Sequence, residues 1–412
     1  MKKALSLILS IAISTTLAIP ASAEDSTESV DSRQYALSSE AISDVSRMVS
    51  NMLDYSPEHS ASEFKVGSYI PAYTWDGDRF SVDRSAIRYP VYADDKIVAF
   101  YTLIDPESGS GAKQFGVEFA NELNDFVSSG VTEYFLVGFE GKVFAVSNGN
   151  ADLLVDYGTT NIDLELIKAR IASMEDSNIK ANYEEFYKMV ESKQSAGGSL
   201  RAARANATKG LTEVDLEKSL AESDIAFNVN QDQNSLSSLQ NLTSSNARAA
   251  RAGKYRYFKV GTYNQLPDTK ICWAVATTRI GNFLTDISKT PKQVVKYIHG
   301  VDSEYGNIID AQDALDGLYS LTTDYHDNGF TWSEVGDYIE GGTLLYGAFY
   351  DSGYTTGHAV CVNGYYIDGS EGILIMESLG GYYNQLLPDS GGTYWLNYSG
   401  LGNLSWEASL TT

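Results

Sequence analysis

The chain has few side chains that bind transition metals: its 412 residues include two cysteines and four histidines. These residues show no recognisable ligand spacing, so we expect no metal site. If the protein is exported, two cysteines favour a disulfide as the first interpretation. However, if His358 lies on a strand and faces Cys272, then Cys361 points to the opposite face. We therefore expect Cys361 to be a small buried apolar residue, with a disulfide as the alternative.

Basic residues are absent after Lys296, and the formal net charge of the chain is −24. This charge makes nucleic acid an unsuitable partner. The acidic C-terminal part would attract basic peptides or basic processing sites. The alternative is that the acidity only keeps the protein soluble.

Long apolar runs are also missing, so no segment is expected to span a membrane. The most apolar stretch, residues 4–17, follows Lys2 and Lys3 and precedes the small residues Ala21-Ser22-Ala23. This order is typical of a signal peptide cleaved before Glu24. The sequence therefore predicts a signal peptide over residues 1–23 and a secreted, extracellular protein.

Residues 24–193 predict a separate α+β domain of a size that supports its own core. Apolar residues at helical or alternating spacing predict its elements. The expected helices cover residues 38–54, 115–126, 163–174 and 183–190, and the expected strands cover residues 64–70, 97–104, 134–139 and 142–146. Glu140-Gly141 predicts a tight turn between the last two strands. The domain has one histidine, His59, and no catalytic constellation.

Residues 194–253 are rich in Ser, Asn, Ala and Gln, which predicts a flexible linker. The segment Arg201-Ala-Ala-Arg204-Ala recurs as Arg248-Ala-Ala-Arg251-Ala. Exposed basic residues in a linker are suitable protease sites. We interpret the four arginines as zymogen-processing sites; a chance repeat in a low-complexity tether is the alternative.

Residues 254–412 predict a second α+β domain, with helices first and strands afterwards. Helices are expected from Cys272 onward and over residues 291–298, 311–319 and 332–339. Strands are expected over residues 344–349, 358–366, 372–377 and 394–398.

Cys272 opens an apolar-periodic run, with Asp268 or Thr269 as the expected helix cap. A thiol in the first turn of a helix lies near the positive end of the helix dipole, which favours the nucleophilic thiolate. Such a nucleophile needs a base.

Among the histidines, His358 is the best candidate for this base. His299 precedes Gly300 at an expected helix end, His326 lies in a polar turn, and His59 belongs to the other domain. A satisfied core histidine is the alternative interpretation of His358.

Three motifs together resemble the papain-like cysteine peptidases. They are Gln265-x6-Cys272-Trp-Ala, then Gly-His358-Ala-Val, then Ile-Leu-Ile-Met-Glu377-Ser-Leu-Gly. The resemblance covers residues 254–412 only, and the compact size is similar to that of staphopains or double-glycine leader peptidases. It implies a papain-like fold preceded by an α+β propeptide that covers the active site, and a reaction that needs no cofactor.

The resemblance also implies a role for each residue. Cys272 would be the nucleophile, and His358 would be the general base and acid. Glu377 stands where the family has an orienting Asn or Asp; a merely polar strand end is the alternative. Gln265 would donate to the oxyanion together with the Cys272 backbone N–H. Its spacing is one residue longer than usual, so Asn264 remains a second candidate.

These observations predict a secreted cysteine endopeptidase that is made as a zymogen and cleaves peptide bonds through an acyl-enzyme. Its expected partners are protein or peptide substrates, its own propeptide and an activating protease. Two alternatives remain. One is a papain-fold hydrolase or transpeptidase of cell-wall peptides. The other is a catalytically degenerate secreted binding protein.

Overall fold

The computed structural model describes residues 44, 45, 48, 49, 52, 64–67, 69–75, 80–105, 111–131, 134–147, 150–157, 164–173, 212–214, 226–228, 255–266, 268, 270–354, 356–367, 371–398 and 402–412. The expected signal peptide, His59, the four linker arginines and the expected helix over 183–190 lie outside these residues. So does most of the expected helix over 38–54. No helix in the described part of the chain is long and apolar enough to cross a membrane.

The chain combines helices and strands, as the α+β prediction requires. Its described helices are α2 (Ala120–Ser128), α3 (Leu164–Ser173), α7 (Cys272–Leu284), α8 (Pro291–His299), α9 (Ile308–Leu318) and α10 (Trp332–Glu340). The strands before residue 200 are β1 (Phe64–Val66), β2 (Ala72–Trp75), β3 (Phe80–Val82), β4 (Ala86–Ala93), β5 (Lys96–Ile104), β6 (Lys113–Gly116), β7 (Phe135–Phe139), β8 (Lys142–Ser147) and β9 (Asn150–Asp156). The later strands are β10 (Thr212–Val214), β11 (Ala226–Asn228), β12 (Tyr255–Tyr257), β13 (Asp324–His326), β14 (Leu345–Tyr350), β15 (Gly357–Ile367), β16 (Glu371–Met376), β17 (Tyr383–Leu387), β18 (Trp395–Tyr398) and β19 (Gly402–Thr411).

Local sequence signals account for several of these boundaries. Helix α8 starts with a capping box between Thr290 and Gln293 and carries Pro291 at its first position. It ends at Gly300, whose φ of 74° places it in the left-handed region. The β7–β8 hairpin turns through Glu140 and Gly141, as predicted, and both have positive φ.

Strands from both predicted domains lie in one large sheet within residues 35–412, which form one compact unit. The main path of this sheet is β10-β1-β4-β5-β6-β17-β16-β15-β14-β19-β13, and β12 pairs with β15 in addition. A second sheet has the order β3-β2-β7-β8-β9. Strands β10 and β11 lie within the expected linker and pair with β1 and β12.

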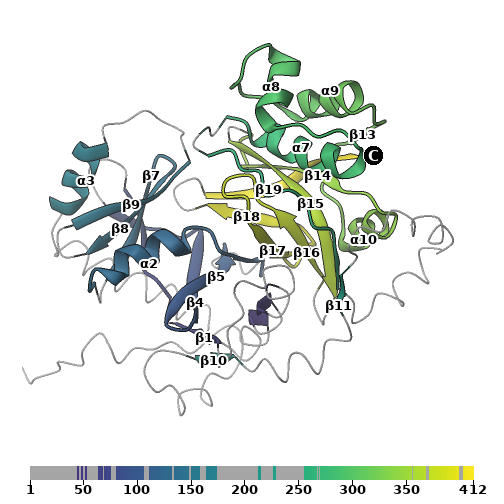
Figure 1. Cartoon of the computed structure of the whole chain (residues 1–412). Helices are drawn as coiled ribbons and strands as arrows, with labels where there is room; N and C mark the ends of the chain where they lie inside the picture. The colour runs from purple at the N-terminus through teal and green to yellow at the C-terminus, as the bar shows by residue number, and fades with distance from the viewer. Residues whose placement is uncertain are drawn as a thin grey trace, which may run out of the picture. The chain divides into compact units, whose positions relative to one another are not determined.

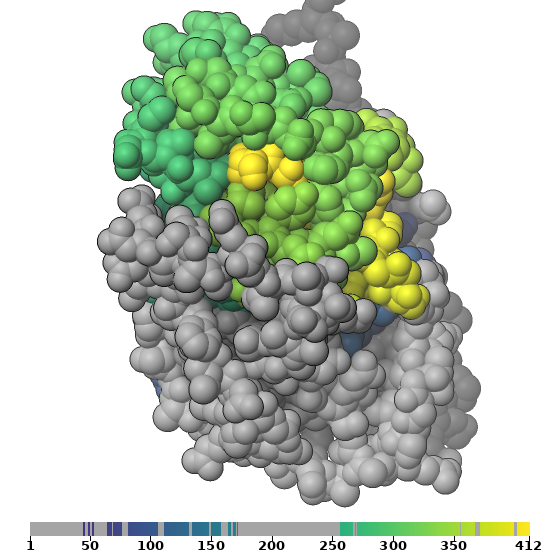
Figure 2. Space-filling view, turned by 90° about the vertical axis from the view of Figure 1, so that its right-hand side faces the viewer, coloured from purple at the N-terminus to yellow at the C-terminus, as the bar shows by residue number. Residues whose placement is uncertain are grey.

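The helices of the C-terminal region cover its strands. Helix α7 packs against β15 and β14, and α8 and α9 pack beside α7 (Figure 1). Helix α10 packs against β15 and β16. In the space-filling view, residues near the C-terminus, in yellow, reach the surface among green segments from earlier in this region (Figure 2).

Three sequence-based expectations differ from the structure. The helix expected over 115–126 begins only at Ala120, because Lys113–Gly116 form strand β6 between β5 and β17. His326 lies on strand β13, which pairs with β19, rather than in a turn. Helix α7 has Ile271 as its N-cap, with no hydrogen bond from that side chain, so Asp268 is not its N-cap; Thr269 lies outside the described residues.

Candidate active site

Cys272 is the first residue of α7 and is partly exposed. The following residues, Trp273 to Gly281, are all buried, so the helix is anchored in the core. The Trp273 indole N–H donates to the carbonyl of Glu304 (3.2 Å). The Trp273 ring meets the His299 ring edge-on, with the ring centroids 5.5 Å apart. Cys272 therefore holds the one partly exposed thiol among the described residues. It lies in the first turn of α7, where backbone N–H groups have no partner within the helix.

The two cysteines are both free, so the disulfide interpretation is wrong. Cys361 is fully buried on β15, and burial raises the pKa of its thiol to about 12, although nearby Arg279 opposes this. Such a thiol stays neutral and is a packing group, as the alternation along the strand predicts.

His358 and Glu377 form a buried pair. The Nε2 of His358 lies 2.5 Å from Oε1 of Glu377, and the two residues are 8% and 0% exposed. His358 is the second residue of β15, and Glu377 directly follows β16. Because these strands are antiparallel neighbours, the start of one meets the end of the other.

His358 also contacts the Cys272 side chain. Burial alone would lower the pKa of His358. The Glu377 carboxylate and hydrogen bonds to Cys272 and Glu377 outweigh burial and raise this pKa to about 10. Since Nε2 is engaged by Glu377, the contact with Cys272 falls to Nδ1. The arrangement therefore favours an imidazolium next to the thiol.

Glu377 is held ionised by its own partners. Burial would raise the pKa of Glu377, but His358, the Tyr398 hydroxyl and the Leu379 backbone N–H lower it below its usual range. The Tyr398 hydroxyl donates to Oε2 (2.5 Å), and the Leu379 N–H donates to Oε1 (3.1 Å). The Tyr398 ring also meets the His358 ring edge-on at 5.2 Å. Each carboxylate oxygen thus has a donor that fixes its orientation.

Gln265 lies beside the strand end that carries Glu377. Its backbone N–H donates to the carbonyl of Ser378 (2.8 Å). The side chain is 3% exposed, and its Oε1 has no hydrogen-bond partner among the described residues. Asn264, the other candidate oxyanion donor, is exposed. Burial at this strand end favours Gln265 over Asn264.

Ser378 connects the three motifs. Its hydroxyl donates to the carbonyl of Ala359 (2.8 Å) and lies 3.4 Å from the carbonyl of Cys272. Its own carbonyl accepts the Gln265 N–H. Cys272, His358, Glu377 and Gln265, which are up to 112 residues apart in sequence (377 − 265), are therefore tied together around one buried residue.

Sequence reasoning missed two residues that hold this site, Tyr398 and Arg279. Arg279 is buried in α7 and donates to the carbonyls of Gly261, Tyr263, Met376 and Glu377. Its position seven residues after Cys272, as a lone charge in an apolar run, was the available signal. Tyr398 ends an apolar strand, and nothing in its local sequence distinguishes it.

The remaining described histidines have other contacts. His299 Nε2 lies 3.7 Å from Asp310 Oδ1, and His326 Nε2 lies 3.1 Å from Thr411 Oγ1. In the part of the chain that the structure describes, no group of three or more His, Cys, Asp or Glu could hold a metal ion. Comparison with protein-family models and with curated proteins found no match to this chain.

Proposed function

We propose that the chain is a papain-like cysteine endopeptidase, secreted by means of residues 1–23 and made as a zymogen. The observation that carries this proposal is the buried His358–Glu377 pair, with Nε2 and Oε1 2.5 Å apart, next to a partly exposed thiol at the first residue of a helix. A histidine that served only in packing would be neutral and would not need an ionised carboxylate beside it. Here both oxygens of the Glu377 carboxylate are engaged by hydrogen bonds.

The proposed reaction has two halves. The Cys272 thiolate attacks the carbonyl carbon of a peptide bond, and the backbone N–H of Cys272 and the side-chain amide of Gln265 stabilise the oxyanion. The His358 imidazolium then donates its proton to the leaving amine as the carbon–nitrogen bond breaks, which leaves a thioester. Next, His358 accepts a proton from a water molecule as the water oxygen attacks the thioester carbon. The carbon–sulfur bond then breaks, which gives the acid product and returns Cys272 as the thiolate beside the His358 imidazolium.

Activation would follow cleavage at Arg201, Arg204, Arg248 or Arg251, either by the enzyme itself or by another protease. The acidic C-terminal region would suit these basic sites. Residues 24–193 would serve as the pro-region.

The test follows the intact mass of residues 24–412 over time, with a reducing agent and an epoxide inhibitor of cysteine peptidases as a label. We expect the wild type to be labelled at one thiol and to cleave casein after processing in the linker. Cys272→Ala should abolish labelling, processing and casein cleavage. Cys361→Ala is the matched control and should retain all three, because its thiol is buried.

Other results would lead to another function. Cleavage of peptidoglycan fragments but not casein would favour the cell-wall alternative. A Cys272 thiol that ignores the label before and after linker cleavage would rule out the peptidase and favour the binding protein.

A further inference from the structure

Strand β17 would be a sheet edge in the C-terminal region if it had no partner beyond β16. In the full chain, β6 occupies this edge: Lys113–Gly116 pair antiparallel with Asn384–Leu387. The other side of β6 pairs with β5, so the sheet continues without a break. An unpaired edge strand exposes backbone donors and acceptors and promotes aggregation. The C-terminal region therefore relies on residues before 200 to complete its sheet.

Buried polar contacts lie beside this pairing. Arg88, 1% exposed, donates to Oδ1 of Asn397. The Asn397 backbone N–H donates to Oε1 of Gln114 (2.9 Å), and its side-chain nitrogen donates to the Ser85 hydroxyl (3.1 Å). Separation of the two regions would leave these groups without their partners, and buried polar groups are costly to leave unpaired.

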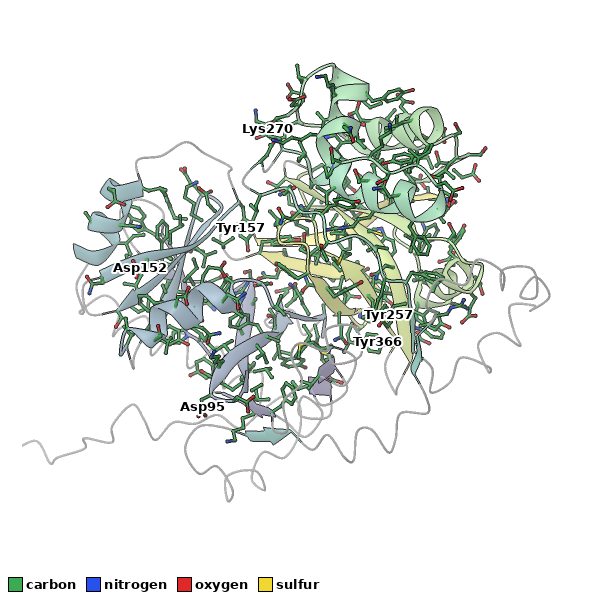
Figure 3. All side chains as sticks on the ribbon, in the orientation of Figure 1. Asp95, Asp152, Tyr157, Tyr257, Lys270 and Tyr366 are labelled. Carbon is green, nitrogen blue, oxygen red and sulfur yellow. The ribbon has the colours of Figure 1, made fainter. Side chains whose placement is uncertain are left out.

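Apolar residues of both regions share one core. Leu374 and Leu387 are buried in the same cluster as Val91 and Phe115, and this cluster also contains Tyr257 and Tyr366 (Figure 3). These side chains would become exposed if residues 64–116 left. The loss of buried apolar area would oppose separation.

The junction also reaches the candidate active site. The Tyr157 ring, labelled in Figure 3, meets the Tyr398 ring edge-on at 5.3 Å. The Tyr398 hydroxyl in turn donates to Glu377. A residue of the N-terminal region thus packs against the group that orients the candidate catalytic carboxylate.

We infer that residues 64–157 stay bound to residues 255–412 after the linker between them is cut, so that the working enzyme is a two-fragment complex joined at β6 and β17. Cleavage does not release the N-terminal region. Cys272 is already partly exposed in the full chain, so the chemistry does not require this region to leave. The inference rests on the proposed function for its use of linker cleavage as the activating event.

Gly116 provides a probe of the junction. It is the β6 residue opposite Asn384, and a Cβ added to Gly116 would lie 1.6 Å from Oδ1 and 2.7 Å from Cγ of Asn384. Gly116→Ala should therefore displace the buried Asn384 side chain and weaken the pairing of the two strands. Asn384→Ala removes the obstructing atoms, so the double variant should pair again. Neither residue belongs to the proposed catalytic machinery.

The experiment uses the chain from residue 24 to 412 with one recognition sequence for a site-specific protease inserted after Arg204 and a second inserted after Arg251, so that the segment with β10, which pairs with β1, is cut from both fragments. After complete cutting, the mixture is diluted and analysed by size-exclusion chromatography and native mass spectrometry. We expect both wild-type fragments in one complex. Gly116→Ala should weaken the complex by about 10-fold or more, and Gly116→Ala with Asn384→Ala should restore most of that loss.

Two results would overturn the inference. One is separate elution of the two wild-type fragments, with the C-terminal fragment remaining folded. The other is a Gly116→Ala variant that binds as tightly as the wild type. Labelling of Cys272 in the same samples tests the proposed function separately. Separated fragments that still label contradict only the inference, whereas a bound pair that never labels contradicts only the peptidase.

Discussion

Glu377 has both carboxylate oxygens engaged, and this has a consequence for the pH dependence of the proposed enzyme. The carboxylate is a main reason why the pKa of His358 reaches about 10 in spite of burial. A raised histidine pKa keeps the imidazolium present below the folded value, so the ion pair between His358 and Glu377 is retained until the pH rises through about 10.

Glu377→Gln should therefore shift the alkaline limb of kcat/KM downward, from near 10 toward the ordinary histidine range near 6.5. It should also lower kcat/KM on the order of 10²-fold, because the imidazole loses its charge partner and its orientation. The measurement is the pH profile of peptide cleavage. Glu377→Asp is the matched control, since it keeps the charge with one methylene less and should hold the limb closer to the wild-type position. An unchanged limb in the Gln variant would show that another group sets the His358 pKa.

At the scale of elements, Arg279 connects the helix of the nucleophile to two other segments. Its guanidinium donates to the carbonyls of Gly261 and Tyr263 before the helix, and to those of Met376 and Glu377 at the end of β16. Burial lowers its pKa to about 10, although Cys361 and Glu377 oppose this. The fork of donors on one planar group suits carbonyls that approach from several directions.

Arg279→Met should lower the free energy of unfolding by about 3–5 kcal/mol, because it removes one partner of a buried polar network and leaves the carbonyls unpaired. Denaturant titration measures this change. Hydrogen exchange should also rise in residues 261–265 and 376–380, which the arginine holds. Lys292→Met is the matched control, because Lys292 is exposed near the start of α8 and should change stability little. A loss of stability equal to that of the control would contradict the role of Arg279 in holding these segments together.

The elements also show what the sequence can predict. Helix α8 matches its expected range because its signals are local: a capping box, Pro291 at the first position and Gly300 at the end. Strand β6 was missed because its strand state depends on β17, more than 260 residues later. The helical spacing of Phe115, Phe119 and Phe126 concealed it.

The candidate site divides in the same way. Cys272, His358, Glu377 and Gln265 stand in motifs with recognisable neighbours, so their residue types and order could be predicted. Tyr398 acts through a contact that crosses between strands, and no short motif marks it. Ser378 stands within the third motif, but its contacts with Gln265, Cys272 and Ala359 are not local in sequence. The lack of a side-chain cap on α7 could not be predicted from local sequence either. The helix is held in place by the burial of Trp273 to Gly281, which depends on distant parts of the chain.

At the scale of the whole molecule, Glu118 lies at the junction between the two regions and is a buried titratable group. Its Oε1 accepts from Gln114 Nε2 (2.6 Å), and its Oε2 is 4.0 Å from Arg88 Nε. Burial raises the pKa of Glu118 to about 7; Arg88 and the Gln114 bond lower it, and Glu377 raises it further. Burial raises the pKa of Tyr157 and of Tyr382, and the charge of Glu118 raises both further.

The sign of the effect follows from linkage. A carboxyl group whose folded pKa lies above its unfolded value binds its proton more tightly in the folded state. Its contribution to stability is complete below about 4.5 and is lost as the pH rises through about 7. The difference between a pKa of 4.5 and a pKa of about 7 corresponds to roughly 3 kcal/mol over this window.

The full-length protein should therefore lose stability between pH 4.5 and 8, and Glu118→Gln should reduce that loss by up to about 3 kcal/mol, because the amide cannot ionise. The comparison is the difference in urea-unfolding free energy between pH 5 and pH 8 for the wild type and the variant, so that other carboxylates cancel. Glu122→Gln is the matched control, one turn away on α2 and exposed, and should behave as the wild type.

If the two regions form the two-fragment complex, its dissociation constant should rise over the same pH window in the wild type and stay flatter in Glu118→Gln. An equal pH dependence in the two proteins would mean that Glu118 is already ionised beside Arg88, and the junction would then be held by an ion pair rather than by a neutral acid.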